Sequence, residues 1–273
     1  MDIIIPVIIG FFLAIFIEFI LLFLLKPMLI EVNAVRENYK GNYIPVSVGI
    51  SWPMTAIIVF SFLYIFSFYE DMYHLFILGI VSISFLGFID DILGQRDTLG
   101  FKGHFTEFFK GRLTTGGLKA LGGGLIAFFL ALLFSATWYE VIINTFIIAL
   151  FTNMLNLLDL RPGRAVKGFL FFLLIIIILA KGNIDWILIS PLLGAVLVYF
   201  PQDLKAQIMM GDAGSNVLGL ILGFLCVLYL SWYFRLAILI FLILMHIYTE
   251  KYSLTKTIEN NRLLRIIDNW GRG

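Results

Sequence analysis

Carboxylates gather at three places where long apolar segments meet basic connections. Asp90 and Asp91 follow the run FLGFI, Asp159 ends the run TNMLNLLD, and Asp212 lies in MMGDAGSN. An ionisable side chain at the edge of a membrane span is costly to place there, so each is a candidate functional residue. The three motifs are expected on the same side of the bilayer. Their four carboxylates therefore predict a site for a divalent cation and a phosphate-bearing substrate.

The second motif repeats a polar residue at every third position. Asn153, Asn156 and Asp159 spread over one wedge of a helix. Polar groups in hydrocarbon need partners, and hydrogen bonds between helices alone would explain them. The next residues favour ligand binding, because a Pro-Gly pair breaks the helix and the flanking Arg161 and Arg164 can bind a polyanion.

The third motif, GDAGSN, comes just before an apolar segment. Gly214 lets the backbone approach a ligand closely, Ser215 can cap a helix, and the free amides of a helix N-terminus bind anions. Asp212 is therefore a candidate metal ligand beside a phosphate. Oxygen ligands without His or Cys predict magnesium or manganese, and not zinc.

A glycine-rich loop joins the first motif to the next apolar segment. Its basic residues are Arg96, Lys102, Lys110, Arg112 and Lys119. Cytoplasmic loops are ordinarily basic, so most of these residues need no ligand. Lys119 differs because it begins an apolar segment at the depth of the carboxylates, and we expect it to bind substrate.

Composition places these motifs in a membrane protein. Of the 273 residues, 61% are hydrophobic and 14% are charged, and the mean hydropathy is +1.00, far outside the range of soluble domains. The lone Cys226 excludes a disulfide framework. We expect an all-α transmembrane bundle that forms one integral membrane domain over residues 1–273, with no nucleic-acid partner.

Nine apolar segments are long enough to cross a membrane, which takes about 20 residues, or nearly so. They cover roughly residues 3–25, 46–68, 75–90, 117–137, 141–158, 168–180, 186–200, 216–231 and 235–250. If the N-terminus is outside, all of the 19 Lys and Arg residues except Lys181 and Arg235 fall in cytoplasmic connections or at their edges. Cytoplasmic loops carry the excess of basic residues, so we expect the C-terminus and the site to face the cytoplasm.

Together and in this order, the motifs resemble those of the polyprenyl-phosphate N-acetylhexosamine-1-phosphate transferases. This family includes phospho-MurNAc-pentapeptide translocases and undecaprenyl-phosphate GlcNAc-1-phosphate transferases. The pair Asp90-Asp91 is similar to the family's Asp pair, NMLNLLD to its N-x-x-N-x-x-D element, and GDAGS to its metal-binding G-D-x-G-S. The resemblance covers most of the chain.

The resemblance implies an enzyme of the plasma membrane that moves a sugar-1-phosphate from a UDP-sugar to undecaprenyl phosphate, with magnesium bound. Such a step initiates cell-envelope glycan synthesis, and a homodimer is compatible with it. The expected catalytic residues are Asp90, Asp91 and Asp159, with Asp212 on the metal. The expected substrate-binding residues are Asn153, Asn156, Lys119, Arg161, Arg164, Gly214 and Ser215.

Two departures from the family pattern leave other functions open. Leu160-Arg161-Pro162-Gly163-Arg164 stands where the family continues with Gly and a second D-G pair, and His74, His104 and His246 form no histidine-rich loop. The alternatives are a diverged, non-catalytic membrane paralogue with a binding or regulatory role, and a cation-coupled transporter, which would need ionisable groups near the bilayer midplane. We expect Arg161 and Arg164 to replace the histidines by binding the nucleotide diphosphate; the alternative is that they anchor the inner leaflet.

The charge distribution predicts where the two ends of the chain lie. A phosphatase fused after Gly273, which is active only outside the cytoplasm, should be inactive. The same phosphatase fused within the short connection at Lys181 should be active. An active fusion at Gly273 would show that a span has been miscounted.

Overall fold

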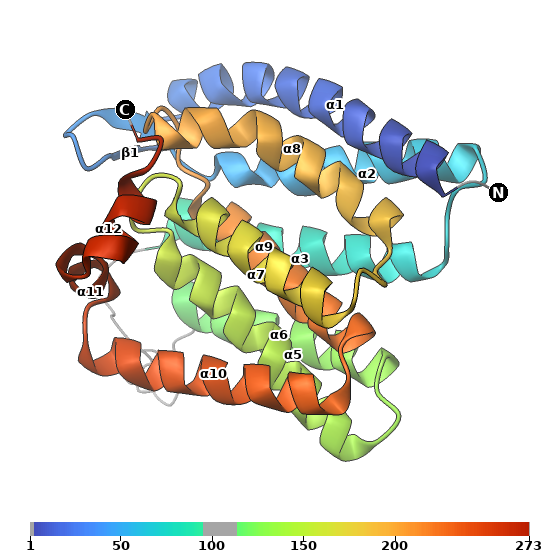
Figure 1. The fold of residues 1–273 in the computed structure, drawn as a ribbon. Coiled ribbons are helices and arrows are strands. Elements are labelled where there is room, and N and C mark those ends of the chain that lie inside the picture. Colours follow the sequence, from blue (N-terminus) through green and yellow to red (C-terminus); the bar gives the residue numbers. More distant parts are fainter. Residues whose placement is uncertain (1–2, 95–113, 273) are drawn as a thin grey trace.

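The structure is a computed structural model that describes residues 3–94 and 114–272 (Figure 1). The described chain is an all-α bundle, as predicted, with one short hairpin in which β1 (Val35–Glu37) pairs antiparallel with β2 (Tyr43–Pro45). The helices are α1 (Ile4–Glu31), η1 (Val48–Ile50), α2 (Ser51–Ile65), α3 (Met72–Leu93), α5 (Thr115–Leu133), α6 (Trp138–Leu158), α7 (Arg164–Leu179), α8 (Trp186–Leu204), α9 (Gly211–Tyr229), α10 (Trp232–Lys251), α11 (Leu254–Asn260) and α12 (Arg262–Asn269). The predicted basic loop is described only in part, since Arg96, Lys102, His104, Lys110 and Arg112 lie outside the described residues.

Each of the nine predicted apolar segments coincides with a helix of the structure. Within the described residues, eight are long and apolar enough to cross a membrane, namely α1, η1 with α2, α3, α5, α6, α8, α9 and α10. The ninth, α7, has only 16 residues and falls short of that length. A multi-pass membrane bundle is therefore confirmed. Of the nine predicted segments, α7 is the one whose helix is shorter than the length set for a membrane span.

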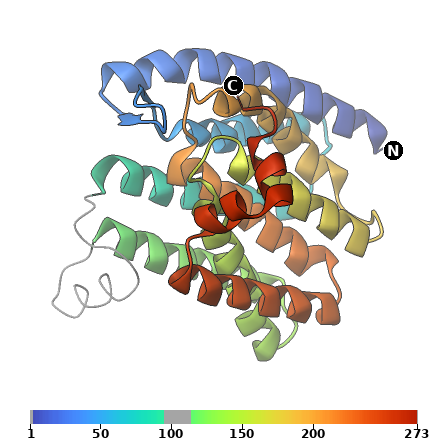
Figure 2. The same ribbon diagram turned by 60° about the vertical axis from the view of Figure 1, so that its left-hand side comes forward.

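The three motifs meet at one end of the bundle. The helices α3, α6 and α8 finish at this end and α5, α7 and α9 begin there, as Figure 1 shows, and the C-terminal α11 and α12 lie against it (Figures 1 and 2). We call it the polar end. The N-terminus lies at the opposite end of the bundle.

Helix α9 forms the centre of the bundle and carries the third motif at its first residues. It packs against α3, α6 and α7, and nearly all of its residues are buried. Glycines allow the close contact with α6: a Cβ on Gly219 would overlap the backbone of Phe151 and Thr152, and one on Gly223 would press on the backbone of Ile148. Small residues serve membrane helices in this way because backbones can then approach each other.

A buried carboxyl group joins α1 to α2. Glu18 is fully buried in the middle of α1 and accepts hydrogen bonds from Ser51 Oγ (2.5 Å) and Thr55 Oγ1 (2.7 Å). An acidic side chain inside a membrane helix needs such partners. Glu18 was not predicted as a functional residue from the sequence, although an acidic residue in the middle of a long apolar segment indicates one.

The tight packing of α9 gives a test of the fold. Gly219→Ala should destabilise the protein by about 1–3 kcal/mol, because the new methyl group overpacks the contact with α6. In detergent, the midpoint of thermal unfolding should fall by several degrees. Gly124→Ala is the matched control, since a Cβ at Gly124 of α5 would meet nothing within 4 Å. An equal loss in both variants would contradict the close contact between α6 and α9.

Candidate active site

The ammonium group of Lys119 lies between two carboxylates at the polar end. Lys119 Nζ, near the start of α5, is 2.9 Å from Asp90 Oδ2 near the end of α3. It also forms an ion pair with Asp212 Oδ2 in the first turn of α9. All three side chains are about one-fifth exposed, so the cluster is accessible from the surface of the protein. Partial burial strengthens these ion pairs, because the local dielectric is lower than in water.

Asn156 of α6 completes this cluster. With its amide nitrogen facing Asp212, Asn156 donates to Asp212 Oδ1 (3.0 Å), and its oxygen then accepts from Lys119 Nζ (3.2 Å). Asp90, Lys119, Asn156 and Asp212 thus come together from four helices. We call these four residues the acidic cluster. The sequence analysis assigned each of them to the site.

Asp91 lies beside the acidic cluster, but its carboxylate binds Ser47 and the start of α9. Its carboxylate is buried and accepts from Ser47 Oγ (2.6 Å) and from the backbone N–H of Ala213 (3.2 Å). Arg36 of β1 donates to the backbone oxygen of Asp91 (2.5 Å). Asp91 therefore fixes the start of α9, and with it Asp212, against α3 and the residues that precede η1.

Asp159 caps the end of α6 and faces further carboxylates. Burial of the carboxyl group raises the pKa of Asp159 well above its usual range, and the charge of Asp203 raises this pKa further. The backbone N–H of Gly211 donates to the carboxylate and opposes this rise. Asp159 thus adjoins the residue before Asp212 and can hold a proton that an exposed aspartate would lose.

Asp203 is a site residue that the sequence analysis missed. It is buried in the last turn of α8 and accepts a hydrogen bond from the backbone N–H of Gly163 (3.0 Å). Its signal in the sequence was the same as that of Asp159, an aspartate at the end of an apolar segment. Arg36 and Ser47, in contrast, carried no pattern that would have marked them.

Three predicted binding residues lie outside the acidic cluster. Asn153 lies one turn before Asn156 on α6, is partly exposed, and makes no hydrogen bond through its side chain within the described residues. Gly214 and Ser215 are buried, and Gly214 packs against Gly49 and Trp52. The structure places these last two residues in the contact of α9 with η1 and α2.

The two predicted arginines contact the C-terminal segment. Arg164 is buried, and its Nε and second amino group donate to Asp268 Oδ1 (2.8 Å) and Oδ2 (2.9 Å) of α12, while Thr255 Oγ1 accepts from its other amino group (2.9 Å). Arg161 is about one-third exposed and lies 3.7 Å from Glu259 of α11. The guanidinium group of Arg164 is thus engaged inside the protein, where the sequence analysis expected it to bind a diphosphate.

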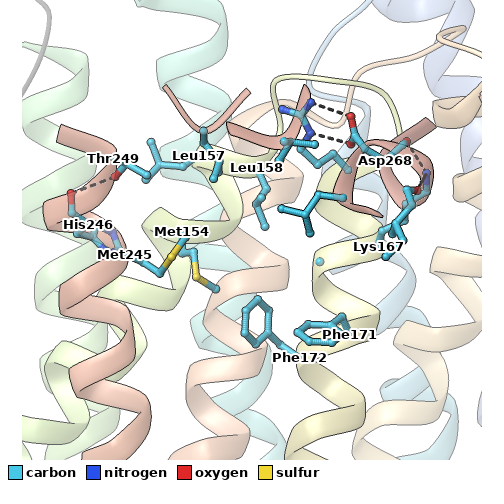
Figure 3. A pocket seen from close by; sticks show the side chains of 16 residues that line it. Met154, Leu157, Leu158, Lys167, Phe171, Phe172, Met245, His246, Thr249 and Asp268 are labelled. Atoms are coloured by element: carbon cyan, nitrogen blue, oxygen red, sulfur yellow. Dashed lines mark hydrogen bonds and ion pairs between the residues drawn. The ribbon is translucent and has the colours of Figure 1, made fainter. Parts of the chain in front are cut away.

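An apolar cavity of about 300 Å³ opens between α6, α7 and α10 (Figure 3). Met154, Leu157 and Leu158 of α6 line it, and Phe171 and Phe172 lie at the end away from Asp268 and Lys167. Side chains of α11 and α12 also line the cavity. An apolar cavity with charged groups at one end suits an amphipathic ligand.

Comparison with known proteins gives two findings. Residues 73–230, more than half of the chain and all three motifs, match the family model described as glycosyl transferase family 4. A phospho-N-acetylmuramoyl-pentapeptide-transferase of Nautilia profundicola is 30% identical over 179 residues, which are 55% of this chain and 51% of that protein. The match therefore spans about half the length of this relative.

The contacts of Arg164 predict a change in stability. Arg164→Lys should lower the free energy of unfolding by about 1–3 kcal/mol, because lysine cannot make both charged hydrogen bonds to the buried Asp268. Thermal unfolding in detergent would measure this loss. Arg161→Lys is the control and should change stability by less than about 1 kcal/mol, since its ion pair is exposed. If Arg164→Lys weakened nucleotide binding without any loss of stability, the original ligand-binding hypothesis would stand.

Proposed function

Because this chain belongs to glycosyl transferase family 4, among the polyprenyl-phosphate hexosamine-1-phosphate transferases, we propose that it transfers a sugar-1-phosphate from a UDP-sugar to a polyprenyl phosphate. The acidic cluster is the observation that carries this proposal. Its two carboxylates, ammonium and amide lie within the matched region and come from four helices at one end of the membrane bundle. Groups arranged in this way can orient and neutralise phosphates at a membrane surface.

The donor set of the acidic cluster is compatible with magnesium. Asp90 and Asp212 offer carboxylate oxygens and Asn156 an amide oxygen, and magnesium prefers such hard ligands. No three His, Cys, Asp or Glu side chains form a ready metal-binding group among the residues described. Asp212 would hold the ion with few protein ligands, and water and substrate phosphates would complete the shell, as is usual for magnesium. The bound ion would neutralise the diphosphate of the UDP-sugar.

In the proposed reaction, an oxygen of the lipid phosphate attacks the phosphorus next to the sugar. The bond from that phosphorus to the oxygen of the leaving UMP breaks, which yields UMP and a lipid-linked diphosphosugar. Asp90 orients the attacking phosphate or accepts its proton, and Lys119 neutralises charge that develops on the phosphoryl oxygens. Asp91 and Asp159 bind the backbone of Ala213 and Gly211 in the first turn of α9, and so keep Asp212 in place.

The apolar cavity is the proposed site for the prenyl chain of the lipid acceptor. The apolar cavity is lined by Met154, Leu157 and Leu158 of α6, and part of the prenyl chain would pack against these apolar walls. The cytoplasm is the proposed side of the polar end, because nearly all basic residues fall there. A soluble UDP-sugar would then reach the acidic cluster from the cytoplasm.

A turnover assay tests the proposal. The purified protein should release UMP from UDP-N-acetylglucosamine or another UDP-sugar when undecaprenyl phosphate is present, and chelation of magnesium should stop the release. Asp212→Asn should lower turnover by on the order of a hundredfold or more, because charge stabilisation at the phosphates is lost. Glu31→Gln at the exposed end of α1 is the matched control and should leave turnover unchanged.

The outcomes separate the alternatives. Both variants should elute as monodisperse protein, so that lost activity is not mistaken for misfolding. Full magnesium-dependent turnover in Asp212→Asn would remove Asp212 from the metal site. A folded wild-type protein that binds UDP-sugars but releases no UMP would instead favour the non-catalytic paralogue.

A further inference from the structure

The short loop between α6 and α7 is held by contacts that are distant in the sequence. Each of its residues from 161 to 164 has such a contact. The pairs are Arg161 with Glu259 (3.7 Å), the Pro162 oxygen with Arg272 Nε (2.8 Å), the Gly163 nitrogen with Asp203 Oδ2 (3.0 Å), and Arg164 with Asp268 (2.8 Å). Three of the four partners belong to the C-terminal segment, residues 254–272. This loop follows Asp159 directly.

Asp268 is the central residue of these contacts. It is buried and accepts from Arg164 and also from both terminal nitrogens of Arg272 (2.9 and 2.8 Å). Burial alone would raise the pKa of Asp268, but hydrogen bonds and charge from the two arginines outweigh it and hold this pKa at about 2. Asp268 therefore stays ionised, and a carboxylate shared by two arginines fixes the position of both side chains.

A lysine of α7 holds the other side of the C-terminal segment. Lys167 Nζ donates to the backbone oxygens of Ile267 (3.0 Å), Asp268 (2.8 Å) and Trp270 (2.6 Å). The carbonyl groups at the end of α12 have no partner within that helix, so a cation there is favourable. Lys167 thus joins the start of α7 to the end of α12 beside the loop.

We propose that Arg272 and Asp268 are positioning residues that fix the loop after α6 and, through it, the carboxylate of Asp159. This inference rests on the proposed function only for its effect on turnover. The loop has few residues, so a shift at Pro162 is passed on to Asp159 at the end of α6. Displacement of a group in an active site by about 1 Å can cost up to a hundredfold in rate.

Kinetics of matched variants test the effect on turnover. Arg272→Gln should lower kcat about tenfold while the KM values for both substrates change less than about twofold, because Arg272 touches neither substrate. Asp268→Asn should act in the same direction, and Asp268→Glu, which keeps the charge, should regain part of the rate. Arg265→Gln is the control, because Arg265 lies on the exposed face of α12 and its side chain makes no hydrogen bond within the described chain.

Hydrogen exchange tests the loop itself without any need for activity. Peptides that cover residues 156–168 should exchange faster in Arg272→Gln than in the wild-type protein, while peptides of α1 and the Arg265→Gln protein stay unchanged. Unchanged exchange at the loop in both Arg272→Gln and Asp268→Asn would overturn the inference, as would faster exchange with unaltered kcat in an active enzyme. A wild-type protein without turnover would refute the proposed function, and the exchange data would still decide whether the C-terminal segment holds the loop.

Discussion

The ion pairs of Lys119 are the interaction on which the polar end depends. Two carboxylates at the edge of a membrane bundle repel each other and lose hydration, and this arrangement is stable only with a cation between them. Lys119 provides that cation from a third helix, α5, and Asn156 of a fourth helix, α6, bridges Asp212 and Lys119. The ends of α3, α5, α6 and α9 must therefore meet at one point, which is also where a phosphate and a metal ion would be expected to bind.

Helix α9 transmits this constraint to the rest of the bundle. Its glycines bring it into backbone contact with α6, and Asp91 binds its first turn. A central helix with so little free space cannot move without displacing its neighbours. The position of Asp212 is thus set by packing far inside the bundle as well as by the buried contacts of Asp91 at the polar end.

The loop after α6 is held in place by residues that are distant in the sequence. Its Arg-Pro-Gly-Arg stands where related transferases carry glycine and aspartate, and the C-terminal segment supplies partners for three of the four residues. The arginines looked like ligands for a diphosphate because a cation beside a carboxylate motif suits both uses. In the structure Arg164 contacts Asp268 from the far end of the chain, and binding of a diphosphate by either arginine stays a prediction.

The class of protein, the helical segments and the three motifs could all be predicted from the amino-acid sequence. These follow from local properties: hydropathy over about 20 residues marks a membrane helix, and a carboxylate beside such a helix marks a functional residue. The same rule, applied to the sequence, would also have singled out Glu18 and Asp203. The partner of each charged side chain, in contrast, depends on how the helices pack. Lys119 and Asp212 are 93 residues apart and Arg164 and Asp268 are 104 apart, and neither pairing has a local signal. Whether a buried arginine binds a ligand or another part of the chain depends on which carboxylate the packed helices bring within reach.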